Sequence, residues 1–101
     1  MTHLLPDQPP PTPGTGDLWR ELIDSDPTWD APRTIAMCEE RRLLGIARYG
    51  TPLQRDNGRD YDVDLIQELL DAAVYAYGSG RSALAKHLIG TVALICEERG
   101  E

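Results

Sequence analysis

The apolar residues in the second half of the chain recur at the three- and four-residue spacing of an α-helix. In the last segment, about residues 82–98, these positions are Leu84, Ala85, Leu88, Ile89, Val92, Ile95 and Cys96. Another helix is predicted over about residues 62–77, and only Gly78-Ser79-Gly80 separates the two. Because so short a connection keeps consecutive helices adjacent, the pattern predicts an antiparallel helical hairpin at the C-terminal side of the chain.

Two further helices are predicted before this hairpin. Asp17 can cap a short helix over the sequence DLWRELI. A longer helix is predicted over about residues 32–49, where Gly50 is a natural residue to end it. The segment TPLQRDNGRD that follows is predicted to be a structured loop with a turn at Asn57-Gly58. With no convincing strand pattern, the sequence predicts an all-α fold, a small helical bundle.

The first 16 residues, MTHLLPDQPPPTPGTG, contain five of the eight prolines and show no periodic apolar pattern. Such a composition buries little apolar surface, and proline-rich runs stay extended. The sequence therefore predicts a disordered proline-rich tail over residues 1–16 and a helical domain over residues 17–101. A domain of that size is expected to gain stability by self-association.

The predicted helix at residues 62–77 is apolar on several sides. Its apolar positions are Val63, Leu65, Ile66, Leu69, Leu70, Ala72, Ala73, Val74, Ala76 and Tyr77. At 100° per residue they cover about 200° of arc, more than a helix with one buried face needs. Some of its neighbours are then expected to come from another subunit, which predicts a homo-oligomer.

The formal net charge is −7, from 17 acidic and 10 basic residues. Nucleic acids and anionic membranes are bound through basic surfaces, so the charge argues against both as main partners. Four arginines nevertheless lie close together in the sequence, namely Arg41, Arg42, Arg48 and Arg55. This group is interpreted either as a site for one phosphorylated small molecule or as a solvated helix face.

The two cysteines, Cys38 and Cys96, are far apart and form no CxxC motif, so zinc and redox sites are not indicated. Reduced, packed thiols are typical of cytoplasmic proteins. No stretch approaches about 18 apolar residues, and the first residues lack the apolar core of a signal peptide. A cytoplasmic location is predicted.

Two groups of acidic residues stand out on the predicted helices. Glu39 has apolar neighbours at helical spacing, so its carboxylate is expected to meet an arginine or to have a functional role. Asp64, Glu68, Asp71 and Tyr75 follow one another at i, i+4, i+7 and i+11 and share one helix face. That face is interpreted either as a solvated acidic surface or as a site for a divalent cation such as Mg²⁺.

The segment ELLDAAVY at residues 68–75 resembles the ExxD helix of the MazG-like all-α nucleoside triphosphate pyrophosphohydrolases. The stretch RYGTPLQRDNGRD followed by DVDLIQELLDAAVY also resembles small bacteriophage-type proteins. Together the likeness covers roughly residues 35–77. In the MazG-like family, acidic motifs on two helices hold Mg²⁺ ions that activate water against a nucleotide's phosphate chain. The resemblance implies that Glu68 and Asp71 would be metal ligands.

The earlier helix of that family supplies two acids one helical turn apart. Here Glu39 is followed three positions later by Arg42, and Glu40 by Leu43, so one acid is absent. In such an enzyme Asp64 would be expected to take its place. As an enzyme, the chain would use Mg²⁺ held by Glu39, Asp64, Glu68 and Asp71, with Glu39, Glu68 and Asp71 as catalytic residues.

Three hypotheses follow. The first is a phage-type oligomer that binds a nucleotide-like molecule, for instance to sequester a defence signal in a host cytoplasm, and needs no cofactor. Its predicted ligand-binding residues are Arg42, Arg48, Tyr49, Arg55, Tyr75 and Arg81. The second is the Mg²⁺-dependent pyrophosphohydrolase. The third is a helical adaptor that binds another protein through an apolar surface or through the PxxP pattern at residues 10–13.

Overall fold

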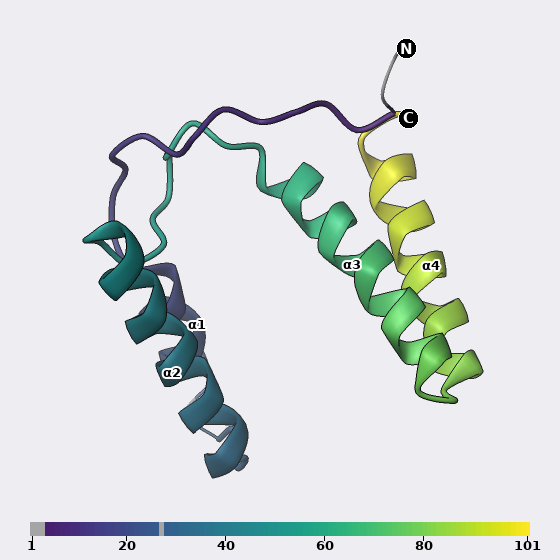
Figure 1. Cartoon of the computed structure of the whole chain (residues 1–101), viewed down its shortest axis with the longest axis horizontal. Coiled ribbons are helices and arrows are strands. Elements are labelled where there is room, and N and C mark those ends of the chain that lie inside the picture. Colours follow the sequence, from purple (N-terminus) through teal and green to yellow (C-terminus); the bar gives the residue numbers. More distant parts are fainter. Residues whose placement is uncertain (1–3, 27) are drawn as a thin grey trace. The chain divides into compact units, whose positions relative to one another are not determined.

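The computed structural model describes residues 4–26 and 28–101. In that part of the chain it contains four helices and no strand beyond an isolated β-bridge (Figure 1). The helices are α1 (Leu18–Asp24), α2 (Pro32–Tyr49), α3 (Tyr61–Gly78) and α4 (Ser82–Glu98). None of these helices is long and apolar enough to cross a membrane. The prediction of an all-α fold is confirmed.

The contacts divide the chain into two compact units, whereas the sequence pattern predicts one helical domain over residues 17–101. The α1–α2 unit consists of residues 9–59. The α3–α4 unit consists of residues 60–101 together with the segment that ends at Gln8. Each unit has its own packing, which the following paragraphs describe in turn.

In the α3–α4 unit the two helices pack against each other along their length as the predicted antiparallel hairpin (Figure 1). The buried apolar residues at their contact are Val63, Ile66, Ala73, Ala76 and Ala85. Three of these are alanines, whose small side chains let the two helices approach closely. This contact excludes water from one side of each helix and is the source of the hairpin's stability.

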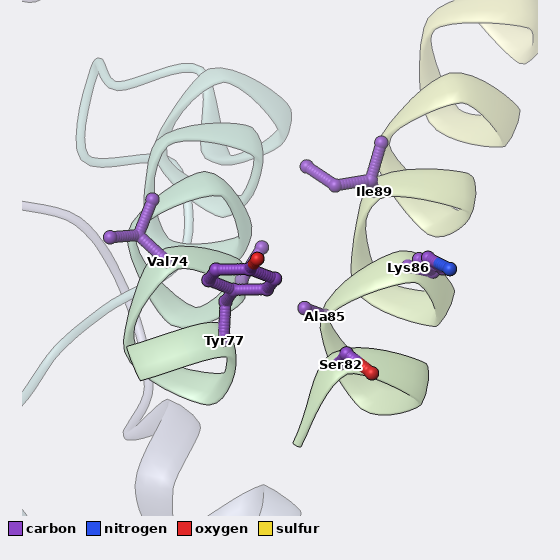
Figure 2. Close-up of a pocket in the computed structure, with 7 residues that line it drawn as sticks. Val74, Tyr77, Ser82, Ala85, Lys86 and Ile89 are labelled. Atoms are coloured by element: carbon purple, nitrogen blue, oxygen red, sulfur yellow. The ribbon is translucent and has the colours of Figure 1, made fainter. Parts of the chain in front are cut away.

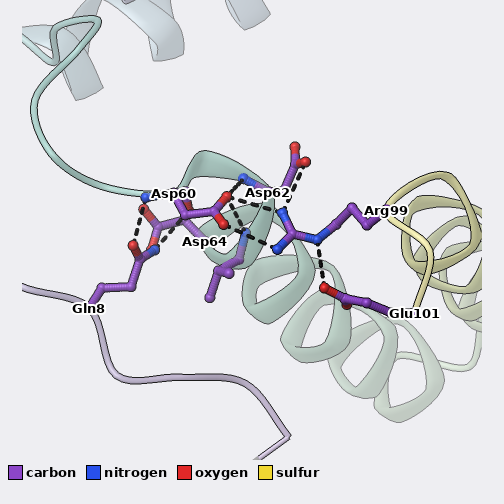
Figure 3. A network of polar contacts seen from close by, with 7 residues as sticks. Gln8, Asp60, Asp62, Asp64, Arg99 and Glu101 are labelled. Carbon is purple, nitrogen blue, oxygen red and sulfur yellow. Dashed lines mark hydrogen bonds and ion pairs between the residues drawn. The ribbon is translucent and has the colours of Figure 1, made fainter.

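Arg99, which directly follows α4, joins the end of that helix to the start of α3 (Figure 3). Its guanidinium donates to Asp60 and Asp62 at 3.1 Å each and to Glu101 at 3.0 Å. Asp60 is also the N-cap of α3, since its carboxylate accepts the backbone N–H groups of Asp62 and Val63. One arginine thus closes the open end of the hairpin and supports the cap of its first helix.

We expect low pH to weaken the contact between Arg99 and Asp60. The hydrogen bond from Arg99 holds the pKa of Asp60 below its ordinary value of 3.8. A lowered folded-state pKa stabilises the fold above the unfolded-state pKa, and the contribution is lost as the pH falls through the folded value. In thermal melts between about pH 5 and pH 2, the chain should therefore lose more stability than the variant Asp60→Asn. Glu68→Gln, which changes an exposed acid of α3, is the control, and equal acid sensitivity of Asp60→Asn and wild type would contradict the expectation.

In the α1–α2 unit the helix ends follow local sequence signals. The Asp17 carboxylate caps α1 by accepting the backbone N–H of Arg20 at 3.0 Å. Pro32 occupies the first turn of α2, where its missing N–H is not needed. Gly50 ends α2 in the left-handed conformation at φ 80°, as predicted from its position. No apolar residue described in this unit is fully buried. The position of α1 on α2 therefore depends largely on the ion pairs between them.

The proline-rich segment lies against the loop after α2 within the same unit. Thr15 and Arg55 exchange two backbone hydrogen bonds of 2.9 and 2.8 Å, and Thr12 N–H donates to the Asn57 carbonyl at 2.7 Å. The composition predicts a disordered tail over residues 1–16, and nothing in its pattern points to these bonds; residues 1–3 lie outside the described residues. The loop around the buried Asn57 is structured, as predicted, and it pairs with the proline-rich segment.

Candidate functional site

The four arginines that the sequence brings together have different roles in the structure. The Arg42 side chain donates to Asp17 at 2.7 Å, and Arg55 donates to Glu21 at 3.2 Å. Burial raises the pKa of the Asp17 carboxyl, but the Arg20 backbone N–H and Arg42 outweigh it and lower that pKa. Arg42 and Arg55 therefore hold α1 in place, a role that the prediction of ligand binding did not include.

Arg41 and Arg48 are the other two, and both are exposed on α2. They are seven residues apart, which places them on the same helix face about 10 Å apart along the axis. Within the described residues, neither has a carboxylate at ion-pair distance. Two guanidinium groups on one face, neither paired with an acid of the described residues, form a local positive surface on an acidic protein.

The Arg48 guanidinium lies over the ring of Tyr49, with 5.3 Å between its central carbon and the ring centroid. This is a cation–π contact. The Tyr49 side chain is 64% exposed, so the tyrosine still offers much of its surface to solvent. Arg48 and Tyr49, two of the residues predicted to bind a ligand, are thus in contact. We call the surface formed by Arg41, Arg48 and Tyr49 the arginine–tyrosine face.

Glu39 forms an ion pair with Arg20 of α1 and is half-buried. This contact raises the pKa of the Arg20 guanidinium above its ordinary value. Of the two interpretations given to Glu39, the pairing with an arginine is confirmed. Its role as a metal ligand or catalytic acid stays a prediction.

The acidic face of α3 is mostly open to solvent. Glu68, Asp71 and Tyr75 are exposed, whereas Asp64 is half-buried and accepts a hydrogen bond of 2.9 Å from the Gln8 side chain (Figure 3). Gln8 also exchanges hydrogen bonds with the backbone of Asp60. Across residues 4–26 and 28–101, no three His, Cys, Asp or Glu side chains are grouped so that they could hold a metal ion. The predicted Mg²⁺ ligands of α3 thus lie on a solvated surface.

An open groove of about 420 Å³ runs between α3 and α4 near the turn that joins them (Figure 2). The residues that line it are Ala73, Val74, Tyr77, Ser82, Ala85, Lys86 and Ile89. Apart from the Ser82 and Tyr77 hydroxyls and the Lys86 amine, the lining is apolar. Arg81, one of the predicted ligand-binding residues, donates to the Ser79 hydroxyl at 2.9 Å in the adjacent turn.

The groove and Arg99 are the features that sequence reasoning missed. Ile89 and Val74 both line the groove, but which residues of the two helices line it depends on the relative rotation of α3 and α4. The alternation of apolar residues fixes that rotation only coarsely. Arg99 had a clearer signal, because an antiparallel hairpin brings the residue after α4 next to the acids that begin α3.

These observations define a small all-α protein with an exposed arginine–tyrosine surface on one helix pair and an apolar groove on the other. Comparisons of the chain with protein-family models, with curated proteins and with solved structures give no match.

Proposed function

We propose that this chain is an oligomeric nucleotide-binding protein and that the arginine–tyrosine face of α2 binds the nucleotide. The single observation that supports the proposal best is the Arg48–Tyr49 contact on an exposed surface, with Arg41 on the same face. Arginine that is already paired with a carboxylate would have to break that pair before it could bind a phosphate. Arg41 and Arg48 have no such pair to break among the described residues.

The chemistry of this face suits a phosphorylated ligand with an aromatic base. Guanidinium groups donate two parallel hydrogen bonds to phosphate oxygens, which gives both affinity and orientation. A tyrosine ring stacks on a nucleobase whatever its identity, because every base has a π face. The separation of Arg41 from Arg48 along the helix favours a ligand that carries charge at more than one point, such as a nucleoside polyphosphate or a cyclic dinucleotide.

Binding without turnover is the form of this function that we favour. The four acids that a MazG-like reaction would need are Glu39, Asp64, Glu68 and Asp71; two of them already hold hydrogen-bonding partners of the chain. A protein that holds a nucleotide intact can keep it from a receptor, and the resemblance to bacteriophage-type proteins suggests a defence signal as the target.

The test is to incubate the protein with nucleoside mono-, di- and triphosphates and with cyclic mono- and dinucleotides, with and without Mg²⁺. Half of each mixture is heat-denatured before chromatography. A nucleotide that leaves the free pool and returns intact after heating shows sequestration. Conversion to a monophosphate and pyrophosphate only with Mg²⁺ would instead show hydrolysis and would overturn the binding proposal.

Arg48→Ala and Tyr49→Ala are each expected to weaken binding of the retained nucleotide about 10- to 100-fold, since charged hydrogen bonds and base stacking contribute about 1–3 kcal/mol each. The matched control is Arg33→Ala, which removes the same charge from the same helix at its other end. Equilibrium dialysis measures the three affinities. If the Arg33 variant loses as much affinity as the Arg48 variant, general charge and not this face binds the ligand.

A further inference from the structure

The outer side of α4 carries a row of residues that the hairpin leaves uncovered. Lys86, Gly90, Ala93 and Glu97 are all exposed. At 100° per residue they fall within about 60° of arc, on the side of α4 away from the buried Ala85. We call these four residues the α4 row.

Two large apolar side chains flank the α4 row. Ile89 is 49% exposed and Leu94 is 59% exposed, one on each side of it. Ile89 and Lys86 also line the groove between the helices, so the row is continuous with that groove (Figure 2). Apolar side chains that border small residues suit contact with another helix better than contact with water.

Gly90 has no local reason to be glycine. A Cβ added there would have no atom within 4 Å, and its φ does not lie in the left-handed range. Glycine within a helix costs about 1 kcal/mol relative to alanine. A second helix that approaches closely at this point would explain the residue, because small side chains let two helix backbones come together.

The charges of the α4 row are complementary to themselves. Lys86 and Glu97 stand at its two ends, three helical turns apart, and neither has an ion-pair partner within the part of the chain that the structure describes. If two such rows meet antiparallel about a two-fold axis, each Lys86 faces the Glu97 of the other copy. The same register sets Gly90 against Ala93 at the crossing, and the two-fold axis places Ile89 beside Ile89 of the other copy on one flank and Leu94 beside Leu94 on the other.

We propose that a second copy of this chain docks on the α4 row, antiparallel, through two Lys86–Glu97 ion pairs and a close Gly90–Ala93 crossing. This proposal rests on the oligomeric part of the proposed function and identifies the surface through which the copies associate. A two-fold contact of this kind uses the same patch on both copies, and every interaction in it occurs twice. The Ile89 side chains of the two copies, each on the rim of its own groove, then lie side by side.

The test is a charge exchange measured by sedimentation equilibrium of the full chain at low salt and without nucleotide. Lys86→Glu and Glu97→Lys are each expected to weaken self-association roughly tenfold or more, because each change makes both symmetry-related pairs repulsive. The double variant Lys86→Glu/Glu97→Lys is expected to restore the association of the wild type. Glu98→Lys, the same charge change one residue outside the row, is the matched control.

Three outcomes would overturn the proposal: a wild-type chain that is monomeric at every concentration, single variants that associate as tightly as wild type, or a double variant that does not recover. Far-UV circular dichroism shows whether each variant keeps its helices, and a variant that loses them is replaced by Gly90→Leu, which blocks the crossing by bulk. Nucleotide retention is measured separately on the same samples. A wild-type chain that stays monomeric but retains nucleotide refutes this surface alone, whereas a wild-type chain that associates as expected but retains no nucleotide refutes the nucleotide proposal alone.

Discussion

Ile66→Ala is expected to lower the free energy of unfolding of the α3–α4 hairpin by about 2–5 kcal/mol. The Ile66 side chain is 2% exposed and belongs to a core of only five apolar residues, of which three are alanines. Truncating this side chain removes much of the apolar contact between the two helices, and the remaining alanines cannot fill the space. Since small domains are stable by only about 5–15 kcal/mol, a loss of this size would melt the hairpin well below the temperature of the wild type.

The measurement is urea unfolding followed by far-UV circular dichroism. Leu65→Ala is the matched control, because Leu65 is the preceding residue of α3 and is 46% exposed. It removes the same number of side-chain atoms, and its expected cost is below about 1 kcal/mol. Equal losses for the two variants would mean that α3 buries a different face from the one described.

Gly14→Ala is expected to detach the proline-rich segment from the loop after α2. A Cβ at this glycine would lie 1.9 Å from the Arg55 carbonyl oxygen, a distance that no side-chain movement relieves because the obstructing atom is backbone. The same oxygen accepts the Thr15 N–H at 2.9 Å, so relieving the clash breaks the backbone pairing next to it. Forcing a methyl group into such a contact costs about 1–3 kcal/mol, toward the upper end here.

Amide hydrogen exchange reports this change locally. The Thr15 and Arg55 N–H groups are expected to exchange at least about tenfold faster in the variant, which is the rate change for about 1.4 kcal/mol. Gly45→Ala is the control, because a Cβ at Gly45 in α2 would have no atom within 4 Å. Unchanged protection at both amides in the Gly14 variant would show that the segment does not pair with residues 53–57.

The helices could be predicted almost to the residue because their signals are local. The helix predicted over residues 32–49 is α2, and the one predicted over residues 82–98 is α4. A proline in the first turn and a glycine after the last one mark the ends of α2 whatever the rest of the chain does. The helix predicted over residues 62–77 is α3, which begins one residue earlier because Asp60 caps it and ends one residue later, at Gly78.

The candidate site was less predictable because it depends on which charges pair. Arg42 and Arg48 look equivalent in the sequence, yet Arg42 meets an acid 25 residues earlier and Arg48 meets the ring of its neighbour. Arg55 likewise meets an acid 34 residues earlier. Such pairings have no periodicity, so only the packing of α1 on α2 reveals which arginines remain available to a ligand.

The pairing of the proline-rich segment with the loop after α2 also sets an order of events during synthesis. Gly14 bonds to Gln54, a partner 40 residues later in the chain. At roughly 5–20 residues per second, the ribosome takes about 2–8 seconds to make that intervening stretch. Throughout that interval the proline-rich segment has no partner to pair with. Its many prolines and few apolar residues keep it from collapsing onto another part of the chain. The composition that suggests disorder therefore also suits a segment that stays unpaired until residues 54–57 have been made.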